Sequence, residues 1–510
     1  MCVLKTKMTY YLSIGVFAAF LGIVQMGYNF RTINVPHRNV KKFLNETFKE
    51  RFGIILTQDS MSIYYSIAMS VFPIGLMIGG LCSSWIAEKF GRKLGMLIPQ
   101  VLSILGATFM GCCKYVSSYE LLIIGRLFVG ISSAILNVIG VLYMVEILPI
   151  HIRGMTGSIG QLAMTLGIFL SNVLGLENVL GGEHCWPLLL GLTVIPSIIQ
   201  SMILPFLPET PRYLILSKRK IEQAEDSLKK LRDSNNVRSE IRRIQLEEQS
   251  NQTNKKYSIR YLLVSSEFRL ILVVCVCMSL SEQACGIAAV LSYSTVIFES
   301  AGIDDKASQY ATVCMSAILV VMSFLIIPLM ERLGRRSLHL TGMGGLIICN
   351  IMITVALAYM SKEYVSYFLI GFIVVFLIFF GLGPASIPRL APAELFTQGP
   401  RSAALSLCFF VVMFTNLIVS ITFPLLHNHL KEFSFLPFAI ISSILFLIIF
   451  WYFPETKNRT SNELSLLFQA PNAWKTRIGH KKMTIEHIIE EDNDNAENKR
   501  LTSDSHKSMA

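Results

Sequence analysis

Two short stretches of sequence decide the fold of this chain. Residues 146–153 read Glu-Ile-Leu-Pro-Ile-His-Ile-Arg, and residues 394–401 read Glu-Leu-Phe-Thr-Gln-Gly-Pro-Arg, so an acid and a base stand seven positions apart in both. Each stretch lies between two long apolar runs. The second stretch therefore reads as a copy of the first, about 250 residues further on.

Two other motifs recur at nearly the same spacing and in the same order. Residues 88–93 (Glu-Lys-Phe-Gly-Arg-Lys) match residues 331–336 (Glu-Arg-Leu-Gly-Arg-Arg), and the Pro-Glu-Thr of residues 208–210 returns at 454–456. Three ordered repeats indicate an internal duplication.

The composition is that of a membrane protein with many spans. Of 510 residues, 53% are hydrophobic and 15% are charged, and the mean hydropathy is +0.54. We therefore predict an all-α integral membrane protein, in which twelve transmembrane helices form two pseudo-symmetric six-helix bundles. Apolar runs of spanning length fall near residues 9–34, 61–87, 94–113, 119–144, 154–176, 186–207, 269–292, 308–330, 337–359, 364–388, 402–425 and 433–453.

The predicted bundles occupy residues 1–207 and 268–453. Residues 208–267 are expected to be a cytoplasmic linker, and residues 454–510 a largely disordered cytoplasmic tail. Apolar residues at steps of three and four within the linker, from Ile221 to Ile244, predict short amphipathic helices, although a disordered tether is an open alternative.

The net charge of +11 arises largely from Lys and Arg in the linker and in loops between apolar runs. This distribution is typical of cytoplasmic loops, so we expect both termini in the cytoplasm and no nucleic-acid partner.

The apolar run after Lys7 lacks a convincing cleavage site and is expected to be a retained span in the plasma membrane. The loop at 35–60 then faces outward, and its sequon Asn45-Glu-Thr predicts glycosylation of Asn45.

The repeated acids and bases are candidates for a cytoplasmic gate. Arginine forms bidentate pairs with carboxylates whose strength depends on solvent access, so such pairs can stabilise an outward-facing state and break when it opens. The alternative, loop charges without a switching role, remains open. The candidates are Glu88, Arg92, Glu146 and Arg153 in the first half, and Glu331, Arg335, Glu394 and Arg401 in the second.

Taken together, the motifs resemble those of facilitative hexose transporters, in the sugar-porter branch of the major facilitator superfamily, over residues 9–460. The resemblance implies a carrier whose halves rotate around a sugar held near the middle of the bilayer. It is carried by Gly91-Arg-Lys93, Gly125-Arg126, residues 146–153, Gln161, residues 208–214, Gln283 with Gly286, residues 331–336, Gly383-Pro384, Ile387-Pro388, residues 394–401 and residues 454–456.

The resemblance also implies a substrate site. Gln161, Gln283 and Asn416 match amides that contact sugar in this family, and neutral amides suit hydroxyl groups because they both donate and accept hydrogen bonds. Amides in membrane helices also bond neighbouring helices, so a structural role is an alternative.

Several positions depart from the family pattern. Glu282 replaces a glutamine and Arg389 replaces a tryptophan that stacks on the sugar. A carboxylate within an apolar helix needs a partner, and we expect Glu282 to pair with Arg389 or Arg31. This pair either reshapes the site toward a ligand other than glucose or is a structural ion pair in a degenerate site. The other departures are Ala288, Leu319, Gly381, Val412 and Met413.

These observations favour passive transport of a hexose such as glucose or fructose, with a small-molecule sugar and the lipid bilayer as partners. The first span offers Gln25, Asn29 and Arg31 where related symporters have a carboxylate, so uniport is expected, with Glu282 as the residue able to take up a proton. A transport-incompetent sugar sensor or scaffold and a carrier of an organic anion or polyol are the alternatives. We find no catalytic constellation, metal cluster or phosphate loop, so no enzyme activity and no cofactor are expected.

Overall fold

The structure is a computed structural model that describes residues 9–459, Leu464 and Phe468, apart from residues 54, 150–155, 217, 235–236, 252–258, 267, 292–304, 360–362, 397 and 458. All of its regular elements in this part of the chain are helices. They are α1 (Tyr10–Arg31), α2 (His37–Phe52), α3 (Gln58–Phe90), α4 (Arg92–Cys112), α5 (Tyr119–Ile147), α7 (Thr156–Leu174), η2 (Glu177–Gly181), α8 (Trp186–Gly191), α9 (Val194–Ile203), η3 (Leu204–Phe206), α10 (Pro211–Leu216), α11 (Ile221–Arg232), α12 (Arg238–Asn251), α13 (Ile259–Val264), α14 (Arg269–Ala284), α16 (Asp305–Leu333), α17 (Arg335–Ala358), α18 (Glu363–Leu382), α19 (Ile387–Leu395), α20 (Gln398–Leu430), η4 (Lys431–Phe433) and α21 (Leu436–Tyr452).

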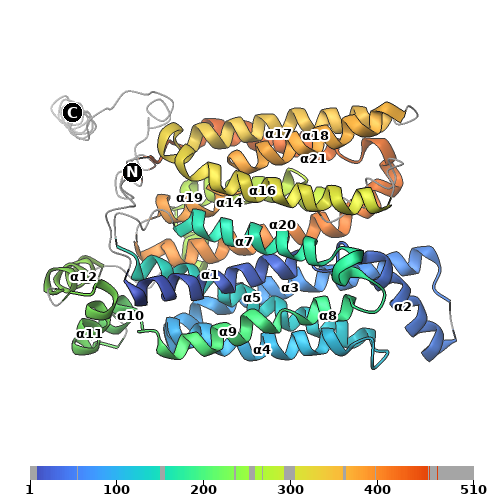
Figure 1. The fold of residues 1–510 in the computed structure, drawn as a ribbon. Helices are drawn as coiled ribbons and strands as arrows, with labels where there is room; N and C mark the ends of the chain where they lie inside the picture. The colour runs from blue at the N-terminus through green and yellow to red at the C-terminus, as the bar shows by residue number, and fades with distance from the viewer. Residues whose placement is uncertain are drawn as a thin grey trace, which may run out of the picture.

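Twelve helical segments among the described residues are long and apolar enough to cross a membrane, which confirms the predicted fold class. In Figure 1 the helices of the first half and those of the second half form two neighbouring groups, with α1, α7 and α20 running between them. The tenth segment continues to Leu395, beyond the predicted end at residue 388. The reason is that Pro388 lies in the first turn of α19, where proline is tolerated, and so does not end the span.

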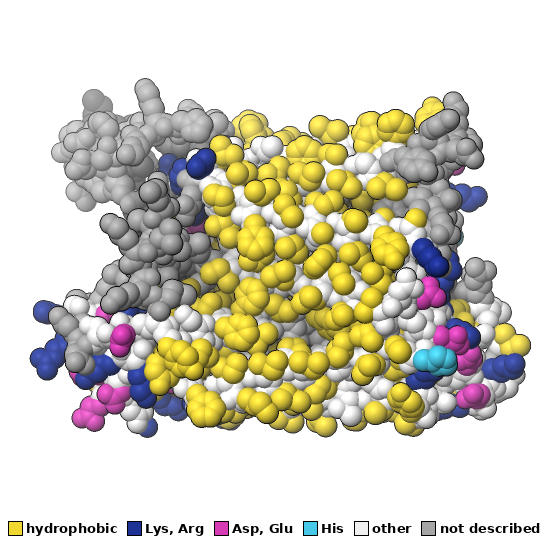
Figure 2. Space-filling model, viewed as in Figure 1, with side chains coloured by type: hydrophobic (Ala, Val, Ile, Leu, Met, Phe, Trp, Pro, Cys, Tyr) yellow, Lys and Arg dark blue, Asp and Glu magenta, His cyan; other side chains and the backbone are white. Residues whose placement is uncertain are grey.

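The outer surface matches a bilayer. Hydrophobic side chains cover the middle of the face shown in Figure 2, while charged side chains gather at its two ends. On α4, for example, Ile98, Val101 and Leu105 are exposed. Such a continuous apolar band would be unfavourable in water and is favourable against lipid.

The linker forms short helices rather than a tether over its described residues. Helices α10, α11 and α12 share a small core that includes Leu214, Ala224, Leu228 and Ile241, and they lie together at one end of the bundles (Figure 1). Arg232 joins this unit to α5, because its Nη1 donates to the main-chain oxygen of Ile147 at 2.8 Å. The linker is therefore packed against the first half.

Residues 35–60, which were expected as a loop, contain α2. This helix lies at the end of the molecule opposite to α10–α12 (Figure 1) and packs Phe43 against Trp186 at a ring distance of 5.3 Å. Asn45 lies on α2 and is partly exposed, and its Oδ1 accepts a hydrogen bond from the main-chain nitrogen of Leu56 at 3.1 Å. Its amide nitrogen is the atom that a glycan would modify.

We expect wild-type protein expressed in animal cells to gain gel mobility when treated with an N-glycosidase, and Asn45→Gln to abolish this shift. The sequon Asn251-Gln-Thr lies in the linker that we expect to be cytoplasmic, so it supplies a matched control, and Asn251→Gln should leave the shift unchanged. A shift that persists in Asn45→Gln would contradict both the glycosylation and the outward placement of α2.

Candidate substrate site

Two of the spans are broken at the middle, and the candidate substrate residues flank the breaks. Helix α14 ends at Ala284, after which the same span continues to Leu291. Helix α18 ends at Leu382, and α19 resumes the span at Ile387. Broken helices in transporters expose polar groups at the depth where substrate binds.

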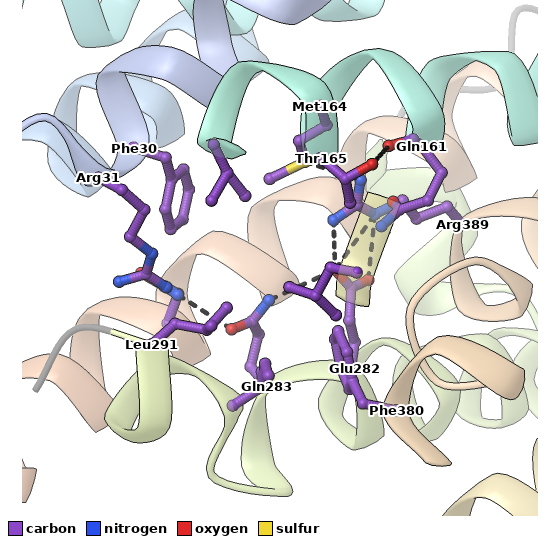
Figure 3. Close-up of a pocket in the computed structure, with 14 residues that line it drawn as sticks. Phe30, Arg31, Gln161, Met164, Thr165, Glu282, Gln283, Leu291, Phe380 and Arg389 are labelled. Carbon is purple, nitrogen blue, oxygen red and sulfur yellow. Dashed lines mark hydrogen bonds and ion pairs between the residues drawn. The ribbon is translucent and has the colours of Figure 1, made fainter. Parts of the chain in front are cut away.

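Glu282 and Arg389 form a close ion pair across these two breaks. The carboxylate of Glu282 has no exposed surface, and its Oε1 lies 2.6 Å from Nη2 and 3.1 Å from Nε of Arg389. The side chain of Arg389 is 34% exposed and borders a cavity. Of the two partners that we expected for Glu282, the structure therefore selects Arg389, while Arg31 lies across the cavity beside Phe30 (Figure 3).

The amides continue this chain of polar contacts. Nε2 of Gln283 donates to Oε1 of Glu282 at 3.3 Å, and Nδ2 of Asn416 on α20 donates to Oε1 of Gln283 at 2.9 Å. Four of the five predicted substrate residues are thus joined in one network within the second half. The network fixes the orientation of each side chain, because every member is held by the next.

Gln161 faces the same cavity from α7 in the first half. Its side chain is 6% exposed, and its Oε1 has no hydrogen-bond partner among the described residues. A buried acceptor without a donor costs free energy unless a ligand or water satisfies it. One turn further along α7, the hydroxyl of Thr165 donates to that of Ser323 of α16 at 3.1 Å, which joins the two halves beside the cavity.

The cavity between the halves is small in this conformation, with a volume of about 40 Å³, which suffices for a few water molecules but not for a hexose. Two hydrogen bonds also join the halves: Nδ2 of Asn34 donates to the main-chain oxygen of Leu291 at 3.0 Å, and the hydroxyl groups of Ser84 and Ser406 lie 2.9 Å apart. The cavity would therefore have to widen before a hexose could bind. The lining residues are Phe30, Arg31, Gln161, Met164, Thr165, Ile168, Glu282, Gln283, Ile287, Leu291, Leu319, Phe380, Arg389 and Asn416.

Four of the gate candidates form two ion pairs, each within one half. Nη2 of Arg92 lies 2.7 Å from Oε1 of Glu146, and Nε of Arg335 lies 3.4 Å from Oε1 of Glu394. These pairs join α4 to α5 and α17 to α19, so in this conformation they stabilise the ends of the bundles rather than the contact between them.

The other gate candidates have different surroundings. Glu88 is exposed and forms no ion pair with a described residue, and Arg401 donates to the main-chain oxygen of Phe396 at 3.2 Å. The side chain of Glu331 and the whole of Arg153 lie outside the described residues.

Two acids with a role at the same end of the molecule were missed by the sequence analysis. Oε1 of Glu209 accepts from the main-chain nitrogen of Arg92 at 3.2 Å, and Oε1 of Glu455 accepts from that of Arg335 at 2.9 Å. Each carboxylate thus caps the first turn of a spanning helix from another segment, where the helix dipole favours negative charge. Burial raises the pKa of Glu209, although these main-chain donors oppose the shift. The repeated Pro-Glu-Thr motif was the available signal.

A buried arginine lies deeper in the first half. Arg126 of α5 is 1% exposed, donates from Nη1 to the main-chain oxygen of Asn29 at 2.9 Å and lies over the ring of Phe72 at 4.8 Å. Within the described part of the chain it forms no ion pair. Arg126 thus contacts the main chain of Asn29, whose neutral side-chain amide donates to the main-chain oxygen of Gln25 and accepts from Thr193.

The fold agrees with what the chain is similar to. The model of the family described as "Sugar (and other) transporter" matches residues 14–468. The facilitated glucose transporter member 3 of Ovis aries is 35% identical over 92% of this chain and 95% of its own length, and member 4 of Homo sapiens is 36% identical over 96% of this chain and 97% of its own.

Solved structures show the same fold. The proton:xylose symporter XylE bound to 6-bromo-6-deoxy-D-glucose superposes with a TM-score of 0.75, at 23% identity, over 90% of this chain and 99% of that one. The inward-open conformation of XylE from E. coli gives a TM-score of 0.72, at 22% identity, over 90% of this chain and 100% of that one.

Proposed function

Because this chain belongs to the sugar transporter family, we propose that it carries a hexose such as glucose or fructose across the plasma membrane by facilitated diffusion. Family membership makes it a transporter and not an enzyme. Its two six-helix halves alternate between outward-facing and inward-facing arrangements around the cavity, with both termini in the cytoplasm.

The observation that carries the proposal is the unsatisfied acceptor of Gln161. A hexose presents hydroxyl donors around its ring, and Oε1 of Gln161 is a buried acceptor at the wall of the cavity between the halves. On the facing wall, the amides of Gln283 and Asn416 bond each other and can exchange that bond for sugar hydroxyls. The apolar side chains of Phe30 and Phe380 supply surface for the carbon face of the ring.

Replacing Gln161 with alanine should lower the kcat/KM of glucose or fructose exchange about tenfold, because one buried hydrogen bond to the sugar is lost. Counterflow of labelled hexose in proteoliposomes measures this. Gln223 is an exposed glutamine of α11, and Gln223→Ala should exchange sugar like the wild type. Equal rates for both variants would remove Gln161 from the substrate site.

Uniport is supported by the surroundings of Arg126. A symporter needs a group that binds and releases a proton during the cycle. Asn29, which stands beside Arg126, cannot do this at physiological pH, and a neutral hexose does not require the Glu282–Arg389 pair to separate. Hexose uptake should consequently be indifferent to a pH gradient.

We further propose that the gate charges keep each half rigid while the halves rotate. Arg92 with Glu146, and Arg335 with Glu394, hold helix ends within one half, and the caps of Glu209 and Glu455 reinforce the same ends. For these charges to form a gate between the two halves, the pairs would have to exchange partners in the outward-facing state.

A second candidate is a sensor that binds sugar without transporting it. The Glu282–Arg389 pair favours it, because an internal ion pair at the cavity wall replaces groups that would otherwise contact a sugar. Two measurements distinguish the sensor from the carrier: the effect of hexose on the thermal unfolding of the purified protein, and hexose counterflow in liposomes. Stabilisation by hexose without any counterflow would support the sensor and refute the carrier.

A further inference from the structure

The carboxylate of Glu282 accepts hydrogen bonds and cannot donate them, because it is ionised in its pair with Arg389. Its Oε1 accepts from Nη2 of Arg389 at 2.6 Å and from Nε at 3.1 Å, and its Oε2 lies 3.4 Å from the same Nε. Nε2 of Gln283 donates to this Oε1 at 3.3 Å. If the amide of Gln283 were turned over, its carbonyl oxygen would face the carboxylate and the two oxygens would repel. The carboxylate therefore selects one orientation of this amide.

The orientation of Gln283 determines where its carbonyl oxygen points. With Nε2 directed at Glu282 (Figure 3), Oε1 lies on the other side of the amide, where Nδ2 of Asn416 donates to it at 2.9 Å. The hydrogen bonds thus run in one direction, from Asn416 to Gln283 to Glu282. All three side chains line the cavity. A sugar hydroxyl that takes the place of Asn416 on Gln283 must donate its hydrogen to Oε1.

The first half presents an acceptor to the same cavity. Oε1 of Gln161 is buried and has no hydrogen-bond partner among the residues that the structure describes. Gln161 and Gln283 line the cavity from α7 and α14, which belong to different halves. Both walls therefore offer a carbonyl oxygen, and both require a substrate group that donates.

We propose that Glu282 is a positioning residue, which holds the carbonyl oxygen of Gln283 ready for a donating hydroxyl of the substrate. It acts through Gln283 and does not itself touch the sugar. This role rests on the hexose transport proposed above and defines its substrates more closely: the hydroxyl at Gln283 has to donate, so a group that only accepts cannot replace it. A neutral side chain in place of Glu282 would let the amide of Gln283 turn over and present its nitrogen instead.

Two kinds of glucose analogue report the direction of a hydrogen bond. A deoxy analogue replaces one hydroxyl by hydrogen, and a deoxyfluoro analogue replaces it by fluorine, which accepts weakly and does not donate. Where the hydroxyl donates to a fixed oxygen, fluorine binds no better than hydrogen. Where it accepts from an N–H group, fluorine binds better. The ratio of fluoro affinity to deoxy affinity, taken for each hydroxyl in turn, therefore distinguishes a fixed oxygen from an amide that can turn.

The test uses full-length protein in liposomes and measures how each analogue competes with the counterflow of labelled D-glucose. In the wild type, loss of the hydroxyl that meets Gln283 should weaken binding about tenfold with either analogue, so the ratio is one or less. The same holds for the hydroxyl that meets Gln161. Gln283→Leu and Gln161→Ala identify these two hydroxyls, because in each variant the matching deoxy analogue should bind like glucose.

The double variant Glu282→Gln with Arg389→Leu removes both charges and releases the amide of Gln283. Its fluoro-to-deoxy ratio should rise about threefold at the hydroxyl assigned to Gln283 and stay unchanged at the hydroxyl assigned to Gln161. Glu282→Gln with Arg389→Gln is a second neutral variant with the same expected result, so the test does not depend on how one replacement packs. Thermal unfolding verifies that both fold.

Two further variants retain the carboxylate. Arg389→Lys keeps an ionised Glu282 beside Gln283 and should keep the wild-type ratios, even where its overall affinity falls. Glu222→Gln changes an exposed acid of α11 and is the matched control, with wild-type affinities and ratios expected.

An ion pair with a structural role alone would lower the affinity of all analogues alike, so unchanged ratios in the neutral variants would overturn the proposal. A ratio above one at the Gln283 hydroxyl in the wild type, or a raised ratio in Arg389→Lys, would overturn it as well. Glucose counterflow reports separately on the carrier. Counterflow with unchanged ratios refutes the positioning role alone, whereas a wild type without glucose counterflow refutes transport of this hexose and the role of Glu282 with it.

Discussion

Arg389→Leu should destabilise the purified transporter by about 3–5 kcal/mol, because it leaves the carboxylate of Glu282 buried without a cation. The remaining contact, from Nε2 of Gln283 at 3.3 Å, is a single neutral hydrogen bond and cannot replace an ion pair. The measurement is thermal unfolding in detergent, with the wild type and the variant in the same buffer.

The double variant Glu282→Gln with Arg389→Leu is the decisive control. It removes both charges together, so its unfolding temperature should return most of the way to that of the wild type. Arg260→Leu serves as a matched arginine control, because Arg260 of α13 is exposed. If the double variant were as unstable as Arg389→Leu, the loss would come from packing of the arginine side chain, and the ion pair would not be its cause.

The Glu282–Arg389 pair also shows how much of the site can be predicted from the sequence. A glutamate within an apolar span requires a nearby cation, and the sequence offers Arg31 and Arg389 as candidates. The choice between them depends on where α14 ends and α19 begins, since Glu282 lies in the last turn of α14 and Arg389 in the first turn of α19. Break positions are set by tertiary packing in the middle of the bundle, and an apolar run does not reveal them.

The duplication was easier to infer than the contacts that it produces. Repeats of Glu146 and Arg92 predicted acids and bases at equivalent places in both halves, and both pairs form. The sequence did not predict that each pair lies within one half. The identity of a charged loop residue does not show which helix it faces. Glu209 was missed for a related reason. Its partners are main-chain nitrogens, and every residue except proline offers one, so the sequence does not indicate the contact.

Gly91→Ala should be strongly damaging at the helix end that Glu209 caps. Gly91 has φ +92° and ψ −175°, a backbone conformation that is essentially restricted to glycine and costs other residues about 1–3 kcal/mol. An added Cβ would also lie 2.5 Å from Oε2 of Glu209, and would push away the carboxylate that caps α4. Strain and loss of the cap therefore add, and the unfolding temperature and the transport rate should both fall.

The same chain supplies a second glycine for this test, from the duplicated motif, and a control glycine on α18. Gly334 has φ +89°, and a Cβ there would lie 2.5 Å from Oε2 of Glu455, so Gly334→Ala should be damaging for the same reason. At Gly371, on α18, an added Cβ would meet nothing within 4 Å, and Gly371→Ala should be neutral or slightly stabilising because alanine favours a helix. If Gly91→Ala and Gly334→Ala unfold at the wild-type temperature, the carboxylate caps do not hold these helix ends, and the rigidity that we assign to each half would need another source.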